Sequence, residues 1–216
     1  MARDIALSVV IPSVHTRLNA FSCHAPKQLF EQFDALPERD RRRVEIISII
    51  DTKSVVLGDK RTAMNLLAGG KYVVHVDDDD DVAPDFISEI LNATDSDADL
   101  ITFLVEAHIN DRPPVLTHYS IKHYGAEQRG PHQSFVIPDN RMVFRRELAV
   151  QVPFPSVLCG EDVAWGKKMR PLLKTEHAIN KVLYRYIYDT HKTETQGKNK
   201  YLPQDDLRKL AFEGLK

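Results

Sequence analysis

Five consecutive aspartates, Asp77 to Asp81, carry the clearest chemistry in the sequence. They directly follow an apolar run, Tyr72 to Val76, whose composition is typical of a buried strand. Carboxylates a few ångströms apart repel one another unless a cation or strong hydrogen-bond donors compensate them. Carboxylate oxygens suit Mg²⁺ or Mn²⁺, and Mg²⁺ often combines one or two carboxylates with water and substrate phosphates. The run therefore predicts a divalent-cation site, with a solvated acidic loop as the alternative.

The elements that would position these aspartates alternate along the first half of the chain. Apolar runs predict strands at 5–11, 44–50, 72–76 and 100–105, and helical spacing predicts helices at 26–36, at 62–67 and after Pro84. This order is typical of a parallel, Rossmann-like α/β sheet, in which ligands bind beyond the carboxyl ends of the strands. Asp51 and Asp77 both follow strands at that edge. The second half predicts shorter strands near 113–119 and 142–144, a helix across 161–173 and a strand at 179–188.

Four segments of this pattern resemble the family-2-like glycosyltransferases of the GT-A fold. They are SVVIPS, EIISIID, GDKRTAMNLLAGGKYVVHVDDDDD and GEDVAW, in the order that the family uses, and the resemblance covers residues 5 to 191. It implies an α/β Rossmann-like GT-A domain with a mostly parallel central sheet, helices on both faces and a small antiparallel extension. It also implies a single domain over 1–216, with a nucleotide-sugar donor-binding half at 1–107, an acceptor-binding and catalytic half at 108–191, and a flexible tail at 192–216.

On the donor side, the resemblance implies that Asp51 recognises the donor's base and that Lys60 or Arg61 lies near the nucleotide. Asp77 to Asp79 would form the DxD element, with Asp77 towards the ribose and Asp79 on a Mn²⁺ or Mg²⁺ ion. The aspartate run leaves this register ambiguous by one residue, and Asp80 could share the metal or contact the sugar. The donor-binding residues implied by the resemblance are Pro12, Asp51, Lys60, Arg61, Asp77 and Asp78.

On the acceptor side, the resemblance implies that Asp162 is the catalytic base and that Glu161 helps to orient the acceptor. A carboxylate in this place can remove the proton from an attacking hydroxyl, although an acidic residue at a helix N-terminus is also favourable on its own. A single base opposite the leaving group implies inversion at the anomeric carbon. In some relatives a late histidine completes the metal shell, which makes His191 a second metal candidate, with an ordinary surface histidine as the alternative.

The resemblance therefore predicts a metal-dependent inverting glycosyltransferase of the hexosyltransferase type. Its donor would be a nucleotide-diphosphate sugar, with UDP favoured, and its acceptor a hydroxyl on a glycan or on a hydroxymethylated base of phage DNA. A nucleotidyltransferase that makes nucleotide sugars is one alternative, but the stretch PSVHTRLNAF after the first strand lacks the glycine-rich loop usual in those enzymes. A non-catalytic cation- or nucleotide-binding module is the other.

Composition excludes some further classes. Lys and Arg total 29 against 31 for Asp and Glu, a formal net charge of -2, so nothing favours a bulk polyanion partner. Cys23 and Cys159 are far apart and have no zinc-ligand spacing, so neither a disulfide framework nor a zinc site is predicted. No apolar stretch approaches the roughly 20 residues that a membrane helix needs. We therefore expect no integral membrane segment and a cytoplasmic, reducing setting.

Overall fold

The computed structural model describes residues 4–157 and 159–189. Its strands form a ten-stranded sheet: β1 Leu7–Val14, β2 Val44–Asp51, β3 Tyr72–His75, β4 Asp81–Val82, β5 Leu100–Ile109, β6 Val115–Tyr119, β7 Ala126–Gln128, β8 Gln133–Val136, β9 Val143–Arg145 and β10 Glu176–Tyr188. The α-helices are α1 Ala25–Ala35, α2 Glu38–Arg41, α3 Leu57–Leu67, α4 Phe86–Ala93, α5 Arg146–Ala149 and α6 Glu161–Met169. Three 3₁₀ helices are η1 His15–Ser22, η2 Thr94–Ser96 and η3 Arg170–Leu172.

The strand order is β2-β1-β3-β9-β5-β6-β8-β7, and β10 pairs with β5 and β4. β1 is parallel to both β2 and β3, and β10 is parallel to β5, whereas β9 runs antiparallel between β3 and β5. The chain leaves β1 for β2 on one side and returns to β3 on the other. Right-handed crossovers therefore place α1 and α3 on opposite faces of the sheet.

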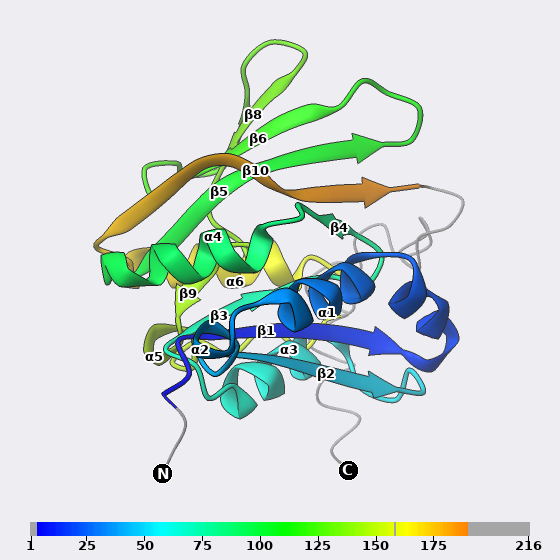
Figure 1. Cartoon of the computed structure of the whole chain (residues 1–216). Coiled ribbons are helices and arrows are strands. Elements are labelled where there is room, and N and C mark those ends of the chain that lie inside the picture. Colours follow the sequence, from blue (N-terminus) through cyan, green and yellow to red (C-terminus); the bar gives the residue numbers. More distant parts are fainter. Residues whose placement is uncertain (1–3, 158, 190–216) are drawn as a thin grey trace, which may run out of the picture.

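Because the strands on the two sides of β1 are reached by connections that run in opposite directions, a topological switch point forms at the carboxyl ends of β1 and β3. In Figure 1 the arrows of β1, β2, β5 and β10 all point to the same edge of the sheet. A crevice opens at the switch point of such a sheet, outside the carboxyl ends, and ligands bind there. The loop Val76–Asp80, which joins β3 to β4 and is called the acidic loop below, starts at this place.

One hydrophobic core holds the sheet and the helices together. Val9, Ile11 and Tyr72 are fully buried, or nearly so, in the central strands. α6 contributes Trp165, whose ring stacks on Phe154 with centroids 4.4 Å apart. Burial of a large apolar side chain contributes about 1.5 to 3 kcal/mol to the stability of the folded state. This packing fixes the edge of the sheet on which the acidic loop lies.

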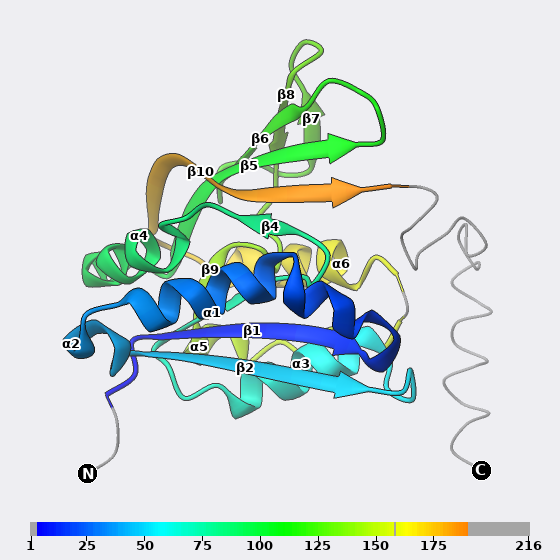
Figure 2. The same ribbon diagram turned by 45° about the vertical axis from the view of Figure 1, so that its right-hand side comes forward.

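The strands β6, β7 and β8 form an extension beyond the core, at the top of Figures 1 and 2. β6 is antiparallel to β5 and β7 is antiparallel to β8, while β6 and β8 are parallel to each other. The predicted fold class is confirmed: a mostly parallel central sheet, helices on both faces and a small antiparallel extension.

Several boundaries differ from the prediction. The first strand continues through Pro12 to Val14, because β2 pairs with it as far as Val14. Pro12 is tolerated there because β3 pairs with β1 only up to Val10. α3 begins at Leu57, five residues before the predicted start. The single-domain division of 1–216 stays a prediction, and the tail 192–216 lies outside the described residues. No helix in the described part of the chain is long and apolar enough to cross a membrane.

Candidate functional site

The side chains of the acidic loop alternate between open and buried positions. Asp77 and Asp79 keep 29% and 37% of their side chains exposed, whereas Asp78 and Asp80 are 3% and 1% exposed. Asp78 and Asp79 lie in a turn in which the N–H of Asp80 donates to the backbone oxygen of Asp77 at 3.4 Å, and this turn directs neighbouring side chains to different sides. The pair that is available to a ligand is therefore Asp77 and Asp79, the spacing that a DxD element requires.

Asp80 anchors the acidic loop to β10. One carboxylate oxygen accepts the hydroxyl hydrogen of Tyr184 at 2.6 Å, and the other accepts the backbone N–H of Ile187 at 2.7 Å. The Tyr184 hydroxyl also accepts the N–H of Asp77 at 3.1 Å. Burial and the neighbouring charges of Asp77 and Asp79 raise the pKa of Asp80 well above its ordinary value. Asp80 is thus enclosed in this structure, and the expectation that it shares the metal or contacts the sugar stays a prediction.

Asp78 faces the end of β1. Its carboxylate accepts the hydroxyl hydrogen of Ser13 and forms an ion pair with Arg17. Burial raises the pKa of Asp78 to about 6, against the lowering effects of Ser13 and Arg17. The same Arg17 Nη2 lies 2.7 Å from an oxygen of Asp79. Arg17 therefore supplies positive charge to the acidic loop from the side of β1.

Arg61 supplies positive charge from the other side. Its Nη2 lies 2.7 Å from Asp77 Oδ1, and its Nε lies 3.3 Å from Glu161 Oε1. Burial alone would raise the pKa of Asp77, but the charge and hydrogen bond of Arg61 hold it below its ordinary value. The Arg61 side chain is almost fully buried, and its Nη1 has no hydrogen-bond partner among the described residues. One arginine thus joins the acidic loop to the N-terminus of α6.

Lys60 and Asp51 form a second buried pair at the end of β2. Lys60 Nζ pairs with Asp51 and donates to the backbone oxygen of Ser13 at 2.6 Å. Asp51 also accepts the N–H of Val55 at 2.8 Å. The hydrogen bond from Lys60 is the main cause that lowers the pKa of Asp51 to about 2. Asp51 therefore lies at the predicted edge as an ionised group. The predicted donor-binding residue Pro12 is buried in β1, where it pairs with Ile49, two residues before Asp51.

A glycine sets the position of α3, which carries Lys60 and Arg61. A Cβ built on Gly58 would lie 1.9 Å from the backbone oxygen of Pro155. Only glycine permits the backbone to approach so closely. This contact brings the first turn of α3 against the segment that leads into α6, and it explains why Arg61 reaches Glu161.

Two carboxylates begin α6. Gly160 precedes them with a φ of +79°, a conformation that favours glycine. Glu161 is 4% exposed, and burial raises its pKa to about 7 against the lowering charge of Arg61. Asp162 is 29% exposed, and burial together with Asp139 raises its pKa as well. Asp162 is therefore the more accessible of the two predicted catalytic residues.

The site also contains residues that the sequence analysis did not single out. Ser13, Arg17 and Tyr184 bond directly to the aspartates of the acidic loop. Arg17 lies in the stretch PSVHTRLNAF immediately after the first predicted strand, so its place at the ligand edge was a usable signal. Tyr184 carried no such signal, because it lies 104 residues from Asp80 in the sequence.

The residues of the acidic loop fit a divalent cation that takes most of its ligands from elsewhere. Within the described ranges 4–157 and 159–189, no group of three or more His, Cys, Asp or Glu side chains has the arrangement of a metal site. Asp77 and Asp79 are two partly exposed carboxylates, which suits an ion that completes its shell with water and substrate phosphates. His191 lies outside the described residues.

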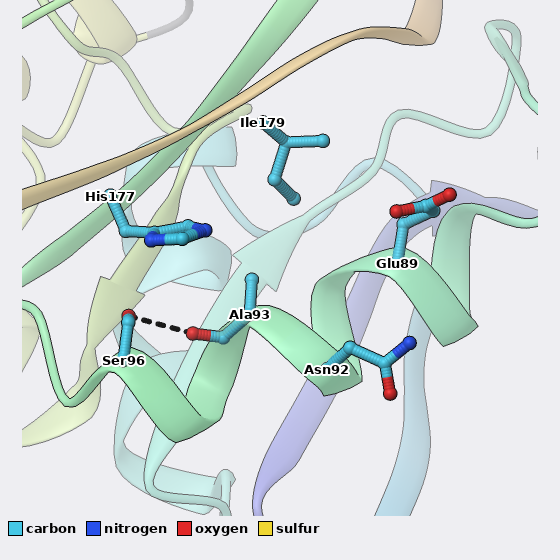
Figure 3. Close-up of a pocket in the computed structure, with 6 residues that line it drawn as sticks. All are labelled: Glu89, Asn92, Ala93, Ser96, His177 and Ile179. Carbon is cyan, nitrogen blue, oxygen red and sulfur yellow. Dashed lines mark hydrogen bonds between the residues drawn. The ribbon is translucent and has the colours of Figure 1, made fainter.

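An open pocket lies away from this site. It has a volume of about 360 Å³ and is lined by residues of α4, η2 and the start of β10, which Figure 3 shows: Glu89, Asn92, Ala93, Ser96, His177 and Ile179. The start of β10 pairs with the start of β5, at the edge opposite the acidic loop. This pocket is therefore separate from the candidate site.

Solved structures with the same architecture come from a glycosyltransferase. The chain aligns with S. aureus TarS 1-349 in complex with UDP-GlcNAc at a TM-score of 0.65 and 14% identity, over 95% of this chain and 64% of that one. For the complex with UDP, the TM-score is 0.60 at 15% identity, over 86% of this chain and 61% of that one. The chain has a GT-A-type glycosyltransferase fold. A third TarS 1-349 structure gives a TM-score of 0.61 at 15% identity, over 85% and 60%.

This GT-A-type chain thus spans less than two thirds of the length of the TarS 1-349 structures. No protein-family model matches its sequence, and no curated protein does. The likeness concerns the fold, and the role of each side chain rests on the geometry described above.

Proposed function

We propose that this chain is a metal-dependent inverting glycosyltransferase that moves a sugar from a nucleotide-diphosphate donor to a hydroxyl acceptor. The observation that carries the proposal is the double contact of Arg61. It joins Asp77, on the donor side of the switch point, to Glu161, next to the exposed carboxylate of Asp162. Donor-binding and proton-accepting groups are thereby held at one crevice, as a displacement reaction requires.

On the donor side, Asp79 is the proposed metal ligand and Asp77 the group on the nucleotide, with the buried Asp78 holding Arg17 in place. The cation would be Mn²⁺ or Mg²⁺, and His191 is a further proposed ligand. When bound, such a cation neutralises the charge that builds up on the departing diphosphate. Arg17 and Arg61 flank the acidic loop and add two fixed positive charges at the same place. Both are suited to phosphate oxygens because a guanidinium offers a fork of donors.

On the acceptor side, Asp162 is the proposed base. The acceptor oxygen attacks the anomeric carbon, the bond from that carbon to the diphosphate breaks, and the hydroxyl proton passes to Asp162. A positioned carboxylate contributes to such a step as a general base. Glu161 is more deeply buried and faces Arg61. We propose that this contact fixes the acceptor side relative to the donor side and so helps to orient the acceptor. Attack from the side opposite the leaving group inverts the anomeric configuration.

The fold likeness supports the choice of donor. Two of the TarS structures are complexes with UDP-GlcNAc and with UDP. We propose that the donor of the present chain is also a UDP-sugar. Asp51 would contact the base, and Lys60, which pairs with Asp51, and Pro12 would complete the nucleotide site. The proposed acceptor is a hydroxyl of a glycan or of a hydroxymethylated base in phage DNA.

A donor screen tests the proposal. Purified protein with Mn²⁺ would be offered UDP-, GDP- and dTDP-sugars, first with water and then with glycan and modified-DNA acceptors. We expect release of UDP from at least one UDP-sugar, faster in the presence of the correct acceptor, and loss of that release with EDTA. Synthesis of a nucleotide sugar from a sugar phosphate and an NTP, with release of pyrophosphate, would instead identify a nucleotidyltransferase. Tight Mn²⁺ binding without any nucleotide binding would identify a cation-binding module.

A further inference from the structure

An arginine lies beside the proposed base. From Arg141 Nη2 to Asp162 Oδ2 the distance is 4.0 Å. We infer that Arg141, clamped by Asp139, is a positioning residue that keeps the Asp162 carboxylate ionised and turned towards the acceptor. The inference rests on the proposed function for its meaning in catalysis, but the electrostatic relationship can be measured without any turnover.

Asp139 holds the guanidinium at two points. The Nε of Arg141 donates to Asp139 Oδ1 at 3.1 Å, and the Nη2 pairs with Oδ2. The backbone N–H of Arg141 donates to the same carboxylate at 3.1 Å. Asp139 is 2% exposed, so water does not compete for these bonds. A two-point bond of this kind fixes the plane of the guanidinium as well as its position.

Two tyrosines enclose the guanidinium further. Its carbon lies 4.9 Å from the ring centre of Tyr186 in β10 and 5.8 Å from that of Tyr119 in β6. Aromatic rings attract a cation over their faces and restrict its movement. The charge of Arg141 also contributes to the lowered pKa of Asp77, on the donor side.

A close helix contact sets the distance between this clamp and Asp162. A Cβ built on Gly166 of α6 would lie 2.3 Å from the backbone oxygen of Pro138, the residue before Asp139. Only glycine permits this approach. α6 therefore packs directly on the segment that carries the clamp, and Asp162, one turn earlier on the helix, comes within reach of Arg141.

The charges that face Asp162 show what Arg141 must offset. Burial raises the pKa of Asp162, and Asp139 raises it further, whereas Arg141, the N–H of Val163 and Arg61 lower it. Glu161 lies next to it in α6, and Tyr119 and Tyr186 lie around the clamp. Without Arg141, two carboxylates from different segments would face each other across a partly buried space. Such a neighbourhood favours the protonated acid, which cannot serve as a base.

The test is an NMR titration of the Asp162 carboxyl carbon in the full chain, with the signal assigned through Asp162→Asn. We expect Arg141→Met to move the midpoint up by about 1 to 3 pH units, and Arg141→Lys to restore much of that change because the charge returns. Asp139→Asn should not raise the midpoint, because it removes a carboxylate that faces Asp162. Arg145→Met is the matched control: its side chain is 14% exposed and pairs with Asp97 away from the site, so the midpoint should stay unchanged.

The same variants would then be compared in the pH profile of kcat/KM. We expect the acid limb to follow the NMR midpoint for Arg141→Met while the affinity for UDP changes little. An Asp162 midpoint that is the same in wild type and in Arg141→Met would overturn the inference, whatever the effect on rate. If the wild type transfers no sugar from any donor, the proposed function fails, and the NMR result still decides whether Arg141 controls Asp162.

Discussion

The hydroxyl of Tyr184 donates to the carboxylate of Asp80 at 2.6 Å and joins β10 to the acidic loop. This bond removes the fourth aspartate of the run from solvent and leaves Asp77 and Asp79 as the open pair. The position of the proposed DxD element therefore depends on a tyrosine far away in the sequence.

Tyr184→Phe should destabilise the fold and, because the acidic loop loses its anchor, should also weaken the binding of the donor. The substitution leaves one oxygen of a buried carboxyl without its donor, which costs about 1 to 3 kcal/mol. Urea unfolding would measure the loss, and titration with UDP and Mn²⁺ would measure the affinity. If the variant had normal stability but lost UDP binding, Tyr184 would belong to the ligand site and the assignment of Asp80 as an anchor would be wrong.

Arg17→Gln should strengthen the binding of Mn²⁺ in the absence of nucleotide. Arg17 lies 2.7 Å from Asp79 and competes with any cation for that carboxylate. Loss of a partly exposed ion pair frees about 1 kcal/mol for metal binding, so the affinity for Mn²⁺ should rise roughly three- to tenfold. Electron paramagnetic resonance of free Mn²⁺ would measure it, with Arg43→Gln as the control because Arg43 pairs with Asp95, outside the acidic loop. Equal or weaker binding in Arg17→Gln would show that Asp79 does not hold the ion.

Much of the fold could be predicted from the sequence because its central strands are buried and continuous. The runs at 5–11, 44–50 and 72–76 became β1, β2 and β3, each within a few residues. The strands β4, β7 and β8 were missed, since their few residues include polar ones and form no apolar run.

The candidate site was predictable only where residues follow strands or begin helices. Asp51 and Asp77 were placed by their positions after strands, and Asp162 by the segment GEDVAW, which resembles the family and begins a helix. The exposure of each aspartate in the run could not be predicted, because it is decided by Tyr184, Ile187 and Ser13, which come from other elements. The clamp of Asp139 on Arg141 likewise depends on the packing of Gly166, which leaves no local pattern.

In wild type, the free energy of unfolding should decrease as the pH rises from 4.5 to 7, and Glu161→Gln should make this decrease smaller. The pKa of Glu161 is raised from 4.5 to about 7 in the folded protein, mainly by burial. The folded state therefore holds a proton that the unfolded state has released, so this stability is complete below pH 4.5 and is lost as the pH rises to about 7. The contribution is on the order of 3 kcal/mol.

Thermal unfolding at a series of pH values would measure this loss. Asp78, whose pKa is raised to about 6, adds a similar slope that should remain in Glu161→Gln. An unchanged pH dependence in Glu161→Gln would show that Glu161 is ionised at acidic pH and that Arg61 outweighs its burial.

Gly166→Ala should lower both stability and transfer. The added Cβ would lie 2.3 Å from the oxygen of Pro138, so α6 must move away from the segment that carries Asp139 and Arg141. Overpacking of this kind typically costs about 1 to 3 kcal/mol. Gly125→Ala is the control, since no atom lies within 4 Å of its added Cβ. A Gly166→Ala protein with normal stability and normal activity would contradict the proposed spacing between α6 and the clamp.

We propose above all that Asp79 holds the metal for donor binding and that Asp162 acts only as the base. Calorimetric titration of UDP in the presence of Mn²⁺ tests this most directly. Wild type and Asp162→Asn should bind UDP with affinities within about threefold of each other, whereas Asp79→Asn should bind at least about tenfold more weakly. Asp162→Asn should at the same time transfer no sugar. Full UDP affinity in Asp79→Asn, or full transfer by Asp162→Asn, would contradict the account.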